Sequence, residues 1–173
     1  METIGSASLG ISESQSAGKV AIGRYWRKIL GNMIDAVTVY DLSGDIVYAN
    51  KLASDNMRYV SAEQLMHQSV TDIADRFMFF DESGALMGVE DLPGRRALRF
   101  NEETESVMHF VGTQENENFW LTVKAFPITG RSLKPKFVVV CYHDITSFKE
   151  AEEMLRDSNR RIAGILDDLL KLG

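Results

Sequence analysis

Residues 137–172 read FVVVCYHDITSFKEAEEMLRDSNRRIAGILDDLLKL, and this stretch decides how the rest of the chain is interpreted. An apolar, β-rich run passes through Asp144-Ile145-Thr146 into a long amphipathic helical pattern, with no turn signal between them. A strand of a globular body that continues without a break into a helix is typical of a lever, by which we mean a helix that changes position when the body changes shape. We therefore expect the preceding residues to form the body that moves this helix.

The helical part carries an apolar seam whose positions step alternately by three and four residues, as in a coiled coil. The seam is weak near the strand, at Ala151 and Ser158, and stronger from Ile162 onward. Because about three heptads are marginal for an independent coiled coil, two alternatives stay open: a parallel dimer, which we favour, and a helix packed on its own domain. The seam comprises Phe148, Ala151, Leu155, Ser158, Ile162, Ile165, Leu169 and Leu172.

The N-terminal region divides into two parts. Its first residues are rich in Ser and Gly and have few large apolar side chains to offset chain entropy, so we expect a disordered tail. Apolar residues then recur at helical spacing, and Trp26 and Ile29 lie on the apolar face of this predicted helix. That face would cover the domain core or a second copy of the chain. The predicted divisions are a tail at 1–19, an amphipathic helix at 20–32, a folded domain at 33–146 and an exit helix at 147–173.

Strand and turn signals alternate between the two long helical patterns. An Asp-Leu-Ser-Gly turn joins the first two β-rich runs, and Asn50 then suits the N-cap of a short helix. Residues 77–90 repeat the aromatic-Asp-x-Ser-Gly chemistry, and we interpret only the turn as shared. Strands are predicted at Val37–Asp41, Ile46–Ala49, Ser106–Gln114, Asn118–Thr129 and Lys136–His143, and short helices at 51–58, 61–66, 69–74 and 91–100, the last with Arg95, Arg96 and Arg99 on its solvent side.

Composition argues against several classes of function. The 173 residues are 45% apolar and 25% charged, which is ordinary for one globular domain with extensions. The net charge of −6 argues against a surface for nucleic acid. The single cysteine, Cys141, fits a reducing cytoplasm, and no apolar run reaches the roughly 20 residues of a membrane span. We therefore expect a cytoplasmic protein without direct membrane contact.

Motifs of catalysis and metal binding are missing from the sequence. It contains no phosphate-binding loop, nucleophile elbow or zinc-protease motif, so we expect a regulatory module and no enzyme. The histidines, His67, His109 and His143, fall on different predicted elements without a second ligand at metal spacing. No metal site is predicted.

The order of the predicted elements, together with three pieces of sequence, resembles the PAS domain family. The pieces are the hairpin VYDLSGDIVYAN at 39–50, the strand with Phe119-Trp120 and Phe126-Pro127-Ile128, and Asp144-Ile145-Thr146 before an Ala-Glu-Glu-rich helix. The segment from Asp91-Leu92-Pro93 to Ala97-Leu98 looks like the helix before the three-strand meander in one PAS subgroup. The resemblance covers about residues 30–150. It implies an α+β fold: a five-stranded antiparallel sheet with short helices on one face and a small cavity.

For function, the resemblance implies a sensory module that relays a cue or a protein contact to a C-terminal effector in the same parent chain. The effector that we expect first is a histidine kinase of a two-component system, with the module working as a homodimer. Asp144 and Thr146 would form the relay junction, and Trp26, Ile29 and the seam would pair the copies. One alternative is a ligand-free dimerisation module that makes its contact through the N-terminal helix and the strand face with Trp120 and Phe126. The other is a redox sensor or photosensor that binds haem or flavin.

Signals for a cofactor are weak. The family's flavin-adduct motif, Gly-x-Asn-Cys-Arg-Phe, is missing, although this leaves a noncovalently held flavin open. The helix at 91–100 has no histidine for haem, and His67 is the residual candidate. The sequence thus argues against haem and flavin and leaves two readings, a filled core or a pocket for a small apolar ligand. The candidate cavity residues are Phe77, Phe79, Met108, His109, Leu121 and Val123, with His109 as a hydrogen-bonding group.

Overall fold

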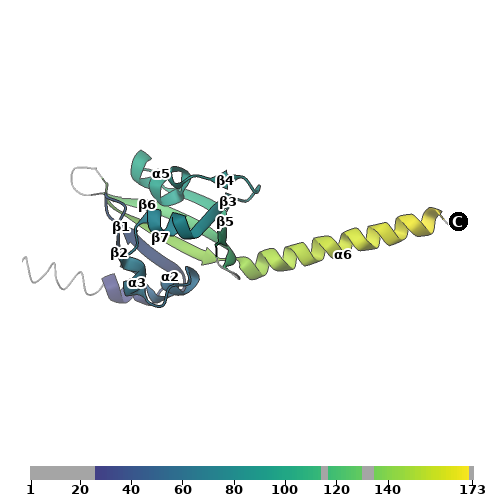
Figure 1. The fold of residues 1–173 in the computed structure, drawn as a ribbon, viewed down its shortest axis with the longest axis horizontal. Coiled ribbons are helices and arrows are strands. Elements are labelled where there is room, and N and C mark those ends of the chain that lie inside the picture. The colour runs from purple at the N-terminus through teal and green to yellow at the C-terminus, as the bar shows by residue number, and fades with distance from the viewer. Residues whose placement is uncertain (1–25, 114–116, 130–134, 172–173) are drawn as a thin grey trace, which may run out of the picture. The chain divides into compact units, whose positions relative to one another are not determined.

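The computed structural model describes residues 26–113, 117–129 and 135–171 (Figure 1). The chain divides into two units, residues 1–34 and residues 35–173. In the first unit residues 26–31 are helical, and both Trp26 and Ile29 are exposed. The predicted tail and the first part of the predicted N-terminal helix lie outside the described residues.

One antiparallel sheet forms the body of the second unit. Its strands follow the order β2-β1-β7-β6-β5-β3-β4, so the long strand β6 lies near the centre, between β7 and β5. The C-terminal strand β7 pairs with both β1 and β6, which places the exit from the sheet beside its first strand. The bounds are β1 Ala36–Tyr40, β2 Ile46–Ala49, β3 Phe77–Asp81, β4 Leu86–Met87, β5 Thr104–Gly112, β6 Asn118–Thr129 and β7 Pro135–Asp144.

The α+β class and the antiparallel sheet are confirmed, but the expected number of five strands is wrong, because the sheet has seven. The additional strands β3 and β4 form a hairpin that pairs with β5. Its turn is built like the β1–β2 turn: an aspartate Oδ1, of Asp41 or Asp81, accepts hydrogen bonds from the N–H groups two and four residues later. Gly44 and Gly84 then take positive φ values of 91° and 86°. The shared turn therefore marks a second hairpin.

Short helices connect β2 to β3 and β4 to β5. The predicted N-cap Asn50 is confirmed, because its Oδ1 accepts hydrogen bonds from Ala53 N at 2.9 Å and from Val37 N at 3.0 Å. This buried side chain thereby ties the start of a helix to β1. The last of the short helices contacts β5, β6 and β7 (Figure 1). The bounds are α2 Lys51–Asn56, α3 Ala62–Met66, α4 Val70–Arg76, η1 Val89–Asp91 and α5 Pro93–Phe100.

The core lies between these helices and one face of the sheet. Side chains of a strand alternate between its two faces, and on β6 this places Phe119, Leu121 and Val123 inward. The ring of Phe119 contacts Phe77 edge to face and stacks on Phe110. Phe110 in turn makes edge-to-face contacts with Phe77 and Phe79. The central strands therefore carry most of the packing that holds the domain together.

The exit helix α6, Thr146–Lys171, follows β7 after a single residue, Ile145. Its first turns contact β6. From Glu150 to Asp168 every side chain is exposed in the single chain. The apolar residues along α6 are therefore not covered by the described part of this chain.

Candidate functional site

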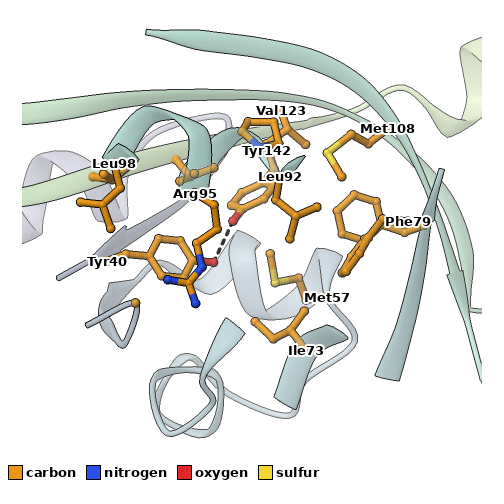
Figure 2. Close-up of a pocket in the computed structure, with 16 residues that line it drawn as sticks. Tyr40, Met57, Ile73, Phe79, Leu92, Arg95, Leu98, Met108, Val123 and Tyr142 are labelled. Atoms are coloured by element: carbon orange, nitrogen blue, oxygen red, sulfur yellow. Dashed lines mark hydrogen bonds between the residues drawn. The ribbon is translucent and has the colours of Figure 1, made fainter. Parts of the chain in front are cut away.

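An apolar cavity of about 60 Å³ lies between the sheet and the helices (Figure 2). Helices and strands both contribute to its walls. Figure 2 shows Phe79 and Met108 at one end, and Arg95 with the two tyrosines Tyr40 and Tyr142 toward the other. Further apolar walls come from Met57, Ile73, Leu92, Leu98, Val123, Val138 and Val140.

Two tyrosine hydroxyls lie at the polar end of the cavity, and the buried hydroxyl of Thr38, behind the lining residues, bonds to one of them. Tyr142 Oη lies 3.1 Å from Tyr40 Oη (Figure 2). Tyr142 Oη also lies 3.1 Å from Thr38 Oγ1. Burial raises the pKa of Tyr40 and raises the pKa of Tyr142 well above its ordinary value, so both phenols stay neutral at physiological pH. Three hydroxyl protons serve two mutual hydrogen bonds, which leaves one O–H to donate to another acceptor.

Arg95 is the one charged residue among those that line the cavity. Its Nε is buried and has no hydrogen-bond partner in the described part of the chain. The guanidinium lies beside the β1–β2 turn, where a Cβ built on Gly44 would come within 3.0 Å of Nη1. The prediction that Arg95 lies on the solvent side of its helix is therefore wrong, because the β1–β2 turn meets the start of α5 at this residue. Arg96 and Arg99, which were predicted on the same side, are exposed.

The structure separates the six candidate cavity residues into three groups. Phe79, Met108 and Val123 line the cavity. Phe77 and Leu121 are buried in the core next to it. His109 lies on the outer face of the sheet, because its neighbour Met108 points inward and consecutive strand residues point to opposite faces. The expectation that His109 faces a ligand in the cavity thus requires correction.

The sequence analysis missed the polar residues that line the cavity, Tyr40, Tyr142 and Arg95, as well as several apolar ones. For the tyrosines a signal was available, because Tyr142 is in phase with the buried Val138 and Val140 along β7. For Arg95 there was none, since its place at the cavity depends on a turn about 50 residues earlier in the chain, at Gly44.

The junction between β7 and α6 is tied to the central strand by hydrogen bonds. Ile145 N donates to Trp120 O at 2.9 Å, and Trp120 N donates to Thr146 Oγ1 at 2.9 Å. Asp144 Oδ1 accepts from Thr146 N at 2.8 Å, as a side chain does at a helix start. Both backbone groups of Trp120 that face β7 are therefore bound by Ile145 and by Thr146, the first residue of α6, so the β6–β7 ladder continues up to the start of the helix.

Side chains on the outer face of the sheet also hold the first turn of α6. The ring of Trp120 stacks on His109 with centroids 4.3 Å apart, and Lys149 Nζ lies 5.3 Å from the centroid of the Trp120 ring. Lys149 Nζ also lies 2.8 Å from Glu82 Oε1, and this carboxylate raises the pKa of the lysine. The indole therefore packs between the sheet and the exit helix.

The remaining polar candidates are placed apart from one another. His67 Nδ1 lies 2.6 Å from Glu63 O at the end of α3, and His143 Nδ1 lies 2.8 Å from Asp35 Oδ1. Among the described residues, no three His, Cys, Asp or Glu side chains gather as metal ligands would. Cys141 is half-buried, and burial, followed by the nearby Asp35, raises the pKa of its thiol.

The predicted seam of α6 is open to solvent in the single chain. Phe148, Leu155, Ile162 and Ile165 are 65%, 63%, 53% and 60% exposed. The side chain of Leu169 and the residue Leu172 lie outside what the structure describes. Within the described ranges, none of the helices has the length and apolarity that crossing a bilayer requires.

Comparisons with known proteins connect this geometry to one fold. No protein-family model and no curated protein matches the sequence. Among solved structures, the PAS domain of nitrogen regulation protein NR(II) from Vibrio parahaemolyticus is 23% identical, with a TM-score of 0.51 over 69% of this chain and 96% of that chain.

Two further solved structures agree with this likeness. A PAS domain from Colwellia psychrerythraea is 21% identical, with a TM-score of 0.54 over 73% of this chain and 98% of that chain. A PAS domain from a two-component sensor histidine kinase is 15% identical, with a TM-score of 0.51 over 73% of this chain and 98% of that chain. Taken with the order of strands and helices, these likenesses show that the chain has the fold of PAS domains.

Proposed function

We propose that this chain is a sensory PAS module that relays a cue from its core to an effector beyond α6. The observation that carries the proposal is the double hydrogen bond between Trp120 and the start of α6. Val123, on the same strand, lines the cavity. A cue that moves β6 would therefore also move the first turn of α6, because the same strand backbone holds both.

The effector that we propose is a histidine kinase in the same parent chain. Support comes from the structural neighbour that is a PAS domain of a two-component sensor histidine kinase. The junction at Asp144 and Thr146 suits this role, because it passes from sheet to helix through Ile145 alone. In such an arrangement the start of the helix changes position when the strand changes position.

We further propose that α6 pairs with α6 of a second copy in a parallel homodimer. A single helix whose apolar side chains are more than half exposed gains little stability from tertiary contacts, and helix formation alone is marginal in water. Pairing would bury the seam residues Leu155, Ile162 and Ile165, each of which contributes about 1.5–3 kcal/mol when fully buried. The domain and its helix would then work as one dimeric unit.

Cysteine cross-linking along α6 tests this pairing. In a Cys141→Ser background, Leu155→Cys, Ile162→Cys and Ile165→Cys should each form disulfide-linked dimers under mild oxidation. Asp157→Cys and Arg160→Cys are the matched controls, since both positions are exposed on the same helix but lie outside the seam. Equal cross-linking at seam and control positions would reject the seam.

A change of helix phase tests the relay. In a fusion of the chain to a histidine-kinase core, inserting one residue between Ser147 and Glu150 rotates the seam by about 100° relative to the domain. We expect altered kinase output. Inserting seven residues at the same place restores the phase of the heptads and should restore output. Unchanged output after the one-residue insertion would reject the lever.

A ligand-free dimerisation module is the second candidate, and the small size of the cavity favours it. A volume of about 60 Å³ is far below the roughly 300–1,000 Å³ of typical ligand sites. The same volume fits neither haem nor flavin. Truncation after Ser147 followed by native mass spectrometry separates this candidate from the first: a dimer that persists without α6 places assembly in the globular part.

A further inference from the structure

The cavity is apolar along most of its wall and polar at one end. Phe79, Met108 and Val123 offer only carbon and sulfur to an occupant. Tyr40 and Arg95 bring a hydroxyl and a guanidinium to the other end (Figure 2). An occupant that matches both parts has an apolar body and one polar group.

The polar end presents donors and a positive charge. Arg95 Nε is buried and has no hydrogen-bond partner in the described part of the chain. A buried donor without a partner lowers the stability of the fold, so such a donor normally has an acceptor, which here would be a bound molecule. None of the ion pairs among the described residues includes Arg95. The Tyr40–Tyr142–Thr38 chain holds one further O–H to donate. The missing partner is therefore an acceptor with negative charge.

The start of α5 adds to this positive character. Leu92, Pro93, Gly94 and Arg95 all line the cavity, so the first turn of the helix borders it. The N-cap position, Leu92, makes no side-chain hydrogen bond to the first turn. The positive end of the helix dipole thus lies at the same end of the cavity as the guanidinium.

The volume limits the size of the occupant. At about 10–15 Å³ for each water-sized group, a cavity of about 60 Å³ holds about four to six such groups, which is the size of a monocarboxylate of two to four carbons. A second charged group would have to lie against Phe79 or Met108, where an unpaired charge is strongly disfavoured. This argues against dicarboxylates and, because the walls are apolar, against inorganic phosphate.

We propose that the cavity is a site for a short-chain monocarboxylate of two to four carbons, with its carboxylate at Arg95 and the Tyr40 end and its alkyl part between Phe79 and Met108. This inference rests on the proposed sensory function for its biological meaning, since the bound carboxylate would be the cue. The binding itself follows from the cavity alone. The guanidinium of Arg95, whose Nε is buried, serves as the charged half of the recognition, and the tyrosine hydroxyls orient the carboxylate.

The test uses the whole chain with ¹³C-labelled methionine methyl groups. Met57 and Met108 line the cavity and report an occupant directly. Sodium propionate should shift both methyl signals in a saturable way. Propionamide, which has the same shape without the charge, should bind at least about tenfold more weakly.

Variants then assign the charge to one residue. Arg95→Gln should weaken propionate binding by about tenfold to a hundredfold and leave propionamide binding unchanged. Arg96→Gln, one residue further on the same helix and exposed, should bind propionate like the unaltered chain. Equal binding of propionate and propionamide, or no shift of the two methyl signals, would overturn the proposal. The comparison of propionate with propionamide uses the unaltered chain, so it tests the proposal even if Arg95→Gln does not fold.

The two proposals fail separately. If propionate binds through Arg95 but the one-residue insertion leaves kinase output unchanged, the relay is rejected and the site remains. If kinase output follows the helix phase but propionate does not bind, the site is rejected and the relay remains.

Discussion

Replacing Thr146 by valine tests the hydrogen bond that joins the sheet to the exit helix. Valine has nearly the shape of threonine, so Thr146→Val removes the hydroxyl and keeps the packing. Trp120 N then loses the Oγ1 acceptor that lies 2.9 Å away. The valine also removes the longer contact in which the Thr146 hydroxyl donates to Trp120 O at 3.5 Å. The bonds from Ile145 N to Trp120 O and from Thr146 N to Asp144 Oδ1 do not involve the hydroxyl.

The expected cost follows from the environment of the lost bond. A buried N–H left without a partner costs about 1–3 kcal/mol. Both Thr146 and Trp120 are only half-buried, so water recovers part of this loss and we expect a decrease of about 1 kcal/mol in the free energy of unfolding. For a chain of 173 residues this corresponds to a Tm lower by about 2–4 °C.

Urea unfolding followed by circular dichroism measures this loss, and amide hydrogen exchange at Trp120 localises it. Thr146→Ser is the control, because it keeps the hydroxyl and removes only the methyl group. We expect faster exchange at the Trp120 amide in the valine variant and near-normal exchange in the serine variant. If serine destabilises as much as valine, the methyl group and not the hydrogen bond holds the junction, and our reasoning fails.

Three further predictions concern the sheet and its turns. Leu121→Ala removes a fully buried side chain and should lower the free energy of unfolding by about 2–5 kcal/mol in urea titration, whereas Thr122→Ala, its half-buried neighbour on the other face, should cost less than about 1 kcal/mol. Hydrogen bonds from Ser83 and Ala85 lower the pKa of Asp81 in the folded chain. The ionised carboxylate therefore stabilises the fold at any pH above the pKa that Asp81 has in the unfolded chain, and this stabilisation is lost as the pH falls through its folded-state pKa. Asp81→Asn should therefore lower the urea midpoint at neutral pH, and the difference from the unaltered chain should vanish as pH falls through the lowered pKa of Asp81; a difference that stays constant with pH would contradict this. Gly84→Ala places a side chain at positive φ and should cost about 1–2 kcal/mol, and Gly44→Ala should cost more in the same urea assay, since its Cβ would also meet Arg95 Nη1; equal losses would mean that Arg95 moves aside freely.

Local signals were the ones that could be read from the sequence. Asn50 was predicted as a cap because its side chain suits the start of a helix, and the structure confirms it. On β6, Leu121 and Val123 were among the candidate cavity residues, and both point inward. These features depend on neighbours within a few residues or on simple alternation, so no knowledge of the fold was required.

Features that depend on distant parts of the chain could not be read in this way. Met108 and His109 were both assigned to the cavity, although adjacent strand residues face opposite sides; the pairing of His109 with Trp120 decides which of them points inward. Arg95 was placed in solvent because its helix is short and amphipathic, and the turn at Gly44 that meets it is remote in sequence. Strand β4 has two residues, too few for a hydrophobic period to appear.

The two edges of the sheet, which we call its rims, are formed by the short strands β2 and β4, and this has a consequence for aggregation. β2 has four residues and β4 has two, and each closes its rim through an Asp-x-Ser-Gly hairpin. Short edge strands are a common defence against uncontrolled strand addition, because they expose few free backbone groups to another chain. In the described residues, neither rim offers a long template on which copies could polymerise. The homodimer that we propose would therefore form through side-chain surfaces, such as the seam of α6, and not by adding strands to the sheet.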